Sequence, residues 1–257
     1  FDEAKELYEE GLTLLVASLG EQHPKVLLNH NNLARLYQNT GDLDAAEAMF
    51  RRVLAGRRLA LGEKHDQVAV TMGDVASVLR ERGRYDDAER MLAEALTLFD
   101  ETLGAEHPAT LVTHVNHGRV LCDLGRFTAA EPELRAGRDG LAAIYGPAHP
   151  RTLIANATLA RAVVAHSDAR EAEELFTSIF DAPAGAIPEP YLTEAHRHYG
   201  AFLAGAGRYP AAEAELLAAE KALREPRGGA VRTRTAVLEA LVNLYSAWDA
   251  AAPGQGH

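Results

Sequence analysis

Residues 103–110 read Leu-Gly-Ala-Glu-His-Pro-Ala-Thr, and closely related stretches begin at residues 19, 61 and 145. Those stretches read LGEQHPKV, LGEKHDQV and YGPAHPRT. Their glycines and histidines recur every 42 residues, at Gly20, Gly62, Gly104 and Gly146 and at His23, His65, His107 and His149. A fixed period of this length is typical of proteins built from stacked structural repeats.

Two more series of residues keep the same period, so chance is excluded as its origin. One is a series of glycines, Gly41, Gly83 and Gly125. The other is a series of alanines that are each followed by glutamate: Ala46, Ala88, Ala130 and Ala172. Beyond residue 180 the spacing shortens by two residues, to Gly207 and Ala212. The repeat therefore predicts a regular array over residues 1–180 and a divergent unit after it.

Each repeat contains two stretches with helical periodicity, which in the first unit cover residues 25–39 and 43–61. Gly41 follows the first stretch, where a left-handed helix end favours glycine. Pro24 begins it, at a position where the missing N–H costs nothing. Each unit is thus predicted to be a helix hairpin with one apolar face, which becomes buried when neighbouring hairpins stack.

Small and bulky residues alternate in register within these helices. The small ones in the first helix are Ala34, Ala76, Gly118 and Ala160, and the bulky ones in the second are Phe50, Leu92, Leu134 and Phe176. This pattern resembles the tetratricopeptide repeat. The 42-residue period, the stretch Asn-Asn-Leu-Ala-Arg-Leu-Tyr at residues 31–37 and the LGxxHP joints are similar to the kinesin-light-chain type. The resemblance implies an all-α, right-handed α-solenoid of antiparallel helix hairpins that serves as a protein-binding scaffold.

The ends of the chain depart from the regular pattern. Residues 1–4 align with residues 85–88, so we expect the chain to start at the second helix of a repeat and a further domain to lie upstream. The predicted division is a regular array (1–180), a proline-rich joint (181–190), a divergent unit with a C-terminal capping helix (191–249) and a disordered tail (250–257). The stretch Leu-Val-Asn-Leu-Tyr-Ser-Ala-Trp at residues 241–248 resembles the closing repeat of C-terminal regions attached to bacterial serine/threonine kinases, which implies a large bacterial regulatory protein.

Composition excludes several classes of function. The net charge of −11 argues against nucleic acid as a partner, because nucleic-acid-binding proteins carry basic surfaces. No run of 18 apolar residues exists, so we expect no membrane span. The single cysteine, Cys122, fits a reducing compartment, and we expect the protein to be cytoplasmic.

The repeated histidines suggest chemistry at first sight, but their spacing argues against it. Copies one repeat apart lie about 10 Å from one another by helix-packing distances, whereas zinc ligands lie about 2 Å from one ion. The histidines are better interpreted as marks of where each hairpin begins. We expect no catalytic residue, no metal ion and no cofactor.

The working surface is expected on the first helices, which line the concave groove of such arrays. Polar residues recur there in register: Asn32, Asp74 and Asn116; Arg35, Arg119 and Arg161; Asn39 and Asp123. The resemblance implies that Asn32 and Asn116 hold the backbone of a bound peptide, which an amide suits because it donates and accepts. The arginines suit an acidic peptide or a free carboxylate, or they pair with Glu81 and Asp123 inside the groove. The sequence leaves both open.

The leading hypothesis is a scaffold that binds a peptide or protein segment in this groove, as the regulatory part of a larger protein. A ligand- or peptide-sensing module that controls an attached effector domain is the alternative. A self-association module or structural spacer is another. The fold alone does not choose among them, because one fold carries many functions.

Overall fold

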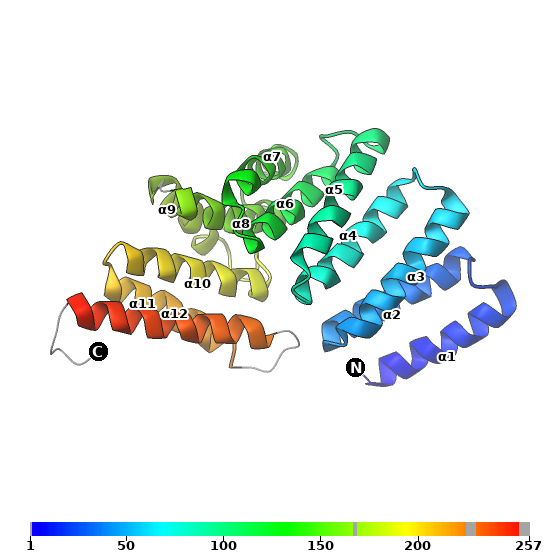
Figure 1. Ribbon diagram of the computed structural model, residues 1–257, viewed down its shortest axis with the longest axis horizontal. Coiled ribbons are helices and arrows are strands. Elements are labelled where there is room, and N and C mark those ends of the chain that lie inside the picture. The colour runs from blue at the N-terminus through cyan, green and yellow to red at the C-terminus, as the bar shows by residue number, and fades with distance from the viewer. Residues whose placement is uncertain (1, 167–168, 225–229, 252–257) are drawn as a thin grey trace. The chain divides into compact units, whose positions relative to one another are not determined.

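The computed structural model describes residues 2–166, 169–224 and 230–251, and these form twelve α-helices (Figure 1). No strand occurs in the described ranges, so the all-α prediction is confirmed. The chain divides into two compact units, Phe1–Arg126 and Phe127–His257. Each unit is a stack of helix hairpins with its own apolar core.

The first unit contains six helices. They are α1 (Asp2–Leu19), α2 (Pro24–Thr40), α3 (Leu43–Leu61), α4 (Asp66–Glu81), α5 (Tyr85–Thr102) and α6 (Pro108–Asp123). Helices α2 and α3 form one hairpin and α4 and α5 the next, while α3 packs against α4 and α5 against α6. Phe50, Leu79 and Leu92 fill the core, and the small residues Ala34 and Ala76 are buried among them. Small and bulky residues thus interlock as the repeat pattern predicts.

The second unit also contains six helices. They are α7 (Phe127–Tyr145), α8 (Pro150–His166), α9 (Ala169–Phe180), α10 (Glu189–Gly205), α11 (Tyr209–Ala222) and α12 (Ala230–Ala251). Helix α12 packs against both α10 and α11, and its Val237 and Leu244 are buried with Leu216. The segment between α9 and α10 is the proline-rich stretch. Of the tail predicted from residue 250, the first two residues end α12, and residues 252–257 lie outside the described residues.

The repeated histidines cap helices. The Nδ1 atom of each histidine accepts a hydrogen bond from the backbone N–H two residues later, at 3.1–3.2 Å, in His23, His65, His107 and His149. This bond satisfies one of the N–H groups that the first turn of a helix leaves unpaired. The preceding glycine, for example Gly104 at φ 86°, makes the turn that a larger residue would strain. The interpretation of the histidines as helix starts is confirmed.

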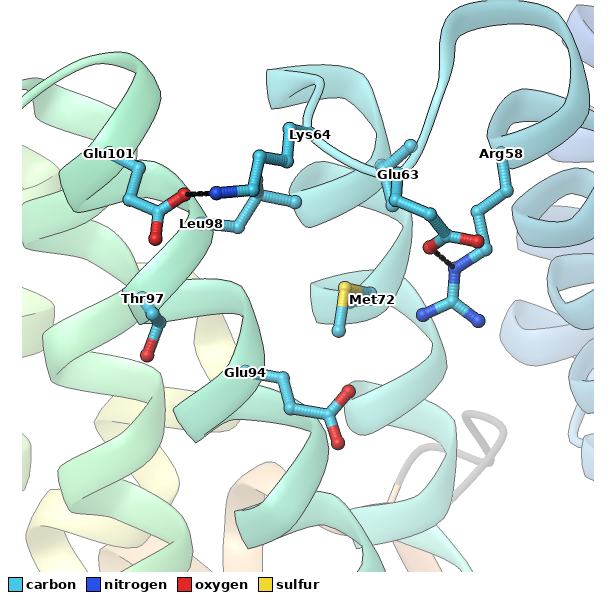
Figure 2. Close-up of a pocket in the computed structure, with 9 residues that line it drawn as sticks. Arg58, Glu63, Lys64, Met72, Glu94, Thr97, Leu98 and Glu101 are labelled. Atoms are coloured by element: carbon cyan, nitrogen blue, oxygen red, sulfur yellow. Dashed lines mark hydrogen bonds and ion pairs between the residues drawn. The ribbon is translucent and has the colours of Figure 1, made fainter.

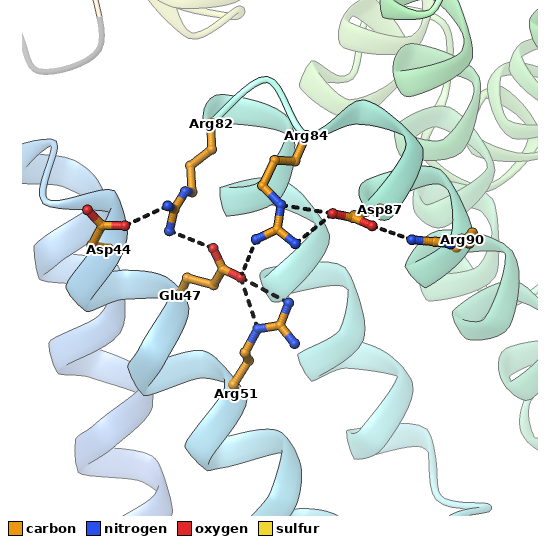
Figure 3. Close-up of polar contacts among 7 residues, drawn as sticks. All are labelled: Asp44, Glu47, Arg51, Arg82, Arg84, Asp87 and Arg90. Atoms are coloured by element: carbon orange, nitrogen blue, oxygen red, sulfur yellow. Dashed lines mark hydrogen bonds and ion pairs between the residues drawn. The ribbon is translucent and has the colours of Figure 1, made fainter.

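In the first unit, a buried carboxylate joins the α2–α3 hairpin to the α4–α5 hairpin (Figure 3). Glu47 on α3, whose side chain is 9 % exposed, accepts hydrogen bonds from Arg51 on its own helix and from two arginines of the α4–α5 turn. These are Arg82 at 2.7 Å and Arg84 at 3.0 Å. A charge buried to this degree needs such partners to be tolerated. In the second unit, Arg208 of the α10–α11 turn likewise pairs with Glu173 on α9.

We expect His107→Ala to lower the free energy of unfolding by about 0.5–2 kcal/mol, because the first turn of α6 loses its side-chain acceptor. His107→Asn should retain most of the stability, since its side-chain oxygen accepts the same kind of bond. Urea unfolding of the three proteins measures both effects. Equal losses in the two variants would show that the imidazole acts through packing instead of capping.

We expect Gly200→Ala to destabilise the second unit by about 1–3 kcal/mol through overpacking. A Cβ at Gly200 would lie 2.7 Å from Cγ of Leu216 and 3.2 Å from the carbonyl oxygen of Ala212, both on α11. Gly205→Ala on the same helix is the matched control, because a Cβ there would meet no described atom within 4 Å. Thermal unfolding compares the two, and a neutral Gly200→Ala would contradict the close contact.

Candidate functional site

The candidate site is the face that the first helices turn away from their hairpin partners. At 100° per residue, the positions two before, one after and five after the small residue lie about 160°, 100° and 140° from it. Because the small residue faces the second helix, these three positions share the opposite side. On α2 they hold Asn32, which is half-buried, and Arg35 and Asn39, which are exposed.

Hydrogen bonds that end on residues of this face connect successive first helices. Arg35 on α2 donates to Oδ1 of Asp74 on α4 at 3.3 Å. Gln38 on α2 donates to Ser77 Oγ at 3.0 Å and to Glu81 Oε1 at 2.5 Å, both on α4. One repeat later, Arg80 on α4 donates to Asp123 on α6. We call this set the first-helix ladder: Arg35, Gln38, Asp74, Ser77, Arg80, Glu81 and Asp123.

The sequence leaves open whether the groove arginines are available to a ligand or pair with Glu81 and Asp123, and the ladder answers this for Arg35. Arg35 pairs with Asp74, and Glu81 and Asp123 accept from Gln38 and Arg80. The sequence interpretation missed Gln38 and Arg80. Their common spacing could have identified them. Each lies four residues after the small residue of its repeat and 43 residues before the carboxylate that accepts its hydrogen bond.

Asp74 is the electrostatically unusual member of the ladder. Its side chain is 20 % exposed, and its Oδ2 atom has no hydrogen-bond partner in the described part of the chain. Burial raises the pKa of Asp74, and the positive charges of Arg35 and Arg57 oppose this only in part. Arg57 on α3 is itself held by Thr71, to whose Oγ1 it donates at 2.7 Å. An acid in the place that Asn32 and Asn116 hold in their repeats therefore costs stability at neutral pH.

The remaining predicted site residues lie on first helices in both units. Asn116 and Arg119 are half-buried on α6 of the first unit. Arg161 is half-buried on α8 of the second unit, and its charge acts on His198 of α10. His198 occupies the asparagine place of its repeat, so the charge of Arg161 acts on the residue at the place that Asp74 holds in its own repeat.

His198 belongs to a buried polar cluster on α10. Burial lowers the pKa of His198 to about 4, so the imidazole is neutral at pH 7. Glu194 accepts a hydrogen bond from Arg197 at 2.6 Å and lies 3.3 Å from His198 Nε2. Burial raises the pKa of Glu194, but His198 and Arg197 together hold it well below its usual range. These contacts hold the three polar side chains of α10 against one another.

The described residues contain no group of three or more His, Cys, Asp or Glu side chains that could hold a metal ion. None of the described helices is both long and apolar enough to cross a membrane. The arrangement offers amide, guanidinium and carboxylate groups along helices, which suits recognition of a polypeptide.

The tetratricopeptide repeat family model matches four overlapping segments: residues 1–59, 27–101, 67–141 and 109–182. The chain belongs to the tetratricopeptide repeat family. A comparison with curated proteins found no match. Tetratricopeptide repeat proteins are generally non-catalytic scaffolds that bind proteins or peptides, and the protein-binding class of function applies to this chain.

Solved structures place the chain near kinesin-light-chain-like proteins of this family. One is a Podosopora anserina structure of kinesin-light-chain "nearly identical TPR-like repeats", at 26 % identity and a TM-score of 0.60, over 70 % of this chain and 84 % of that one. Another is BtubC (BKLC) from P. vanneervenii, at 20 % identity and a TM-score of 0.66, over 86 % and 88 % of the two chains. The kinesin-light-chain-like repeat type is confirmed.

We expect Asp74→Asn to raise the free energy of unfolding at pH 7, because the amide removes a buried charge that Arg35 and Arg57 compensate only in part. The folded pKa of Asp74 exceeds the unfolded value of about 3.9. The penalty is therefore full above the folded pKa and disappears as the pH falls below the unfolded one. Urea unfolding at pH 7 and at about pH 4 should show a gain that shrinks with acid.

Asp100→Asn, at an exposed position on α5, is the control for this measurement. It removes a charge of the same sign and should leave stability nearly unchanged at both pH values. A loss of stability for Asp74→Asn at pH 7 would mean that the ion pair with Arg35 outweighs the burial of the carboxylate.

Proposed function

We propose that the protein is a scaffold whose first-helix face binds an extended segment of a partner protein. The observation that carries the proposal concerns Asn32 and Asn116. Both are half-buried on this face, and neither has a hydrogen-bond partner within the described part of the chain. Half-buried amides without partners provide donors and acceptors to a ligand at little cost in desolvation.

The chemistry of these residues favours the backbone of the bound segment as their target. An asparagine side chain donates and accepts at once, as a peptide group does. Asp74 stands between them in the repeat and offers only acceptors when ionised, so it would meet an N–H group of the segment. The neighbouring ladder residues are bonded to one another, whereas the two half-buried amides keep their donors and acceptors for a ligand.

Arginine favours an acidic segment or a free C-terminal carboxylate. The side chain of Arg35 is 58 % exposed and makes a single contact with Asp74, at 3.3 Å. A guanidinium carries five N–H groups, so a ligand carboxylate can bond to those that Asp74 leaves unused. Arg119 on α6 occupies the same place in its repeat and would extend this preference along the segment.

The wider setting that we propose is a cytoplasmic regulatory protein of bacterial origin with a domain upstream of this array. The resemblance of residues 241–248 to the closing repeat of kinase-attached arrays supports it. In that setting the bound segment would report the presence of a partner to the attached domain.

The proposal is tested with a displayed library of random 12-residue peptides, selected on the complete 257-residue chain. We expect the double variant Asn32→Ala/Asn116→Ala to bind the selected peptides about tenfold more weakly or worse, because several peptide-group hydrogen bonds are lost. Fluorescence polarisation measures affinity, and circular dichroism verifies folding.

Asp100→Ala, on the second helix α5, is the matched control and should retain full affinity. Unchanged binding by a well-folded double variant would overturn the assignment of this face. Selected peptides without acidic residues or a required free C-terminus would overturn the proposed acidic preference, and Arg35→Ala would then leave affinity unchanged.

A further inference from the structure

A second feature of the first unit lies apart from the ladder. A cavity of about 270 Å³ opens between the α3–α4 joint and α5 (Figure 2). Its apolar lining consists of Val68 and Met72 on α4 and Leu98 on α5, which are 0 %, 3 % and 9 % exposed. Glu63, Glu94 and Glu101 surround this lining with carboxylates. Arg58 and Lys64 line the cavity as well, so an apolar floor is combined with a rim that carries one net negative charge.

Two of the three carboxylates are already paired. Glu63 lies 3.0 Å from Nε of Arg58, and Glu101 accepts a hydrogen bond from Nζ of Lys64 at 2.7 Å. Glu94 has neither a hydrogen bond nor an ion pair among the residues that the structure describes. In Figure 2 its carboxylate extends from α5 into the space below Met72. Glu94 is exposed, so one unpaired negative charge lies at the solvent edge of the buried apolar side chains.

The preceding repeat shows what this place holds elsewhere in the chain. Glu21 and Arg52 stand one period before Glu63 and Glu94, and Arg52 donates to Glu21. The change from Arg52 to Glu94 replaces an ion pair with two carboxylates. The following repeat has Ala105 and Ala136 at these positions, so the excess of acid belongs to this repeat alone of the three.

We propose that this cavity accepts an arginine side chain from a partner protein. The guanidinium pairs with Glu94, in the place where Arg52 provides one within the preceding repeat, and the aliphatic stem lies on Met72 and Leu98. Long basic side chains bury their stems in this way while the charged head stays at the surface. The cavity is smaller than the roughly 300–1,000 Å³ of small-molecule pockets, which suits a single side chain.

The net charge of −11 favours approach of a basic partner surface. The contact uses no residue of the first-helix ladder, so it is independent of the segment proposed to bind there. A partner that provides both elements would hold the array on two faces.

The test uses N-acetyl-arginine amide as the probe and N-acetyl-citrulline amide as its neutral isostere. We expect the arginine compound to shift backbone amide signals of Met72, Glu94 and Leu98 in ¹H–¹⁵N spectra of the complete chain, with saturation in the millimolar range. Glu94→Gln should weaken the arginine probe about tenfold, since a charge-assisted bond is lost. Glu106→Gln, an exposed acid in the next joint, is the control and should leave binding unchanged.

Glu94→Arg provides a second test, because it restores the arrangement of Glu21 and Arg52. The new guanidinium should occupy the cavity, abolish the probe-induced shifts and preserve the fold. Equal shifts with citrulline, unchanged binding in Glu94→Gln or persistent shifts in Glu94→Arg would each overturn the proposal. Shifts confined to Asn32 and Asn116 would also overturn it and would place the arginine on the other face.

Discussion

The rest of the structure depends on the close contact between the two helices of each hairpin. Ala34, Ala76 and Gly200 stand where the backbones approach, and at Gly200 even a methyl group would overlap with Leu216. Contact this close fixes the rotation of the first helix about its axis. The opposite side of that helix is thereby held in one orientation, repeat after repeat, and its polar residues come into line. The alignment of these polar residues depends on that rotation more than on any one of them.

The helices follow from the sequence because their signals are local and repeated. The periodic stretch over residues 43–61 is α3 itself, and the stretch over residues 25–39 gains one residue at each end in α2. Pro24 and Gly41 explain those ends, since proline suits the first turn and glycine adopts the left-handed conformation after the last. The buried positions can be predicted equally well. A position that holds only alanine or glycine in every repeat indicates close contact with a neighbouring helix.

The candidate site was only partly predictable from the sequence. Its positions follow from helical periodicity, but the pairing of Arg35 with Asp74 depends on how far one first helix is displaced along the next. That displacement places partners 39 or 43 residues apart instead of 42, and no single repeat encodes it. The burial that raises the pKa of Asp74 also arises from neighbouring helices. The position of a residue on its helix can thus be predicted from one repeat, whereas its side-chain partner depends on how several helices pack.

The ion pairs around Glu47 have a consequence for where the protein can be divided. Arg82 and Arg84 reach this buried carboxylate from the turn of the following hairpin. A fragment that ended after α3 would keep every residue of its own hairpin and yet leave Glu47 with Arg51 alone. The smallest piece with its buried charge fully compensated is therefore one hairpin together with the first helix and turn of the next. The structural module overlaps its neighbour, although the sequence repeats do not overlap.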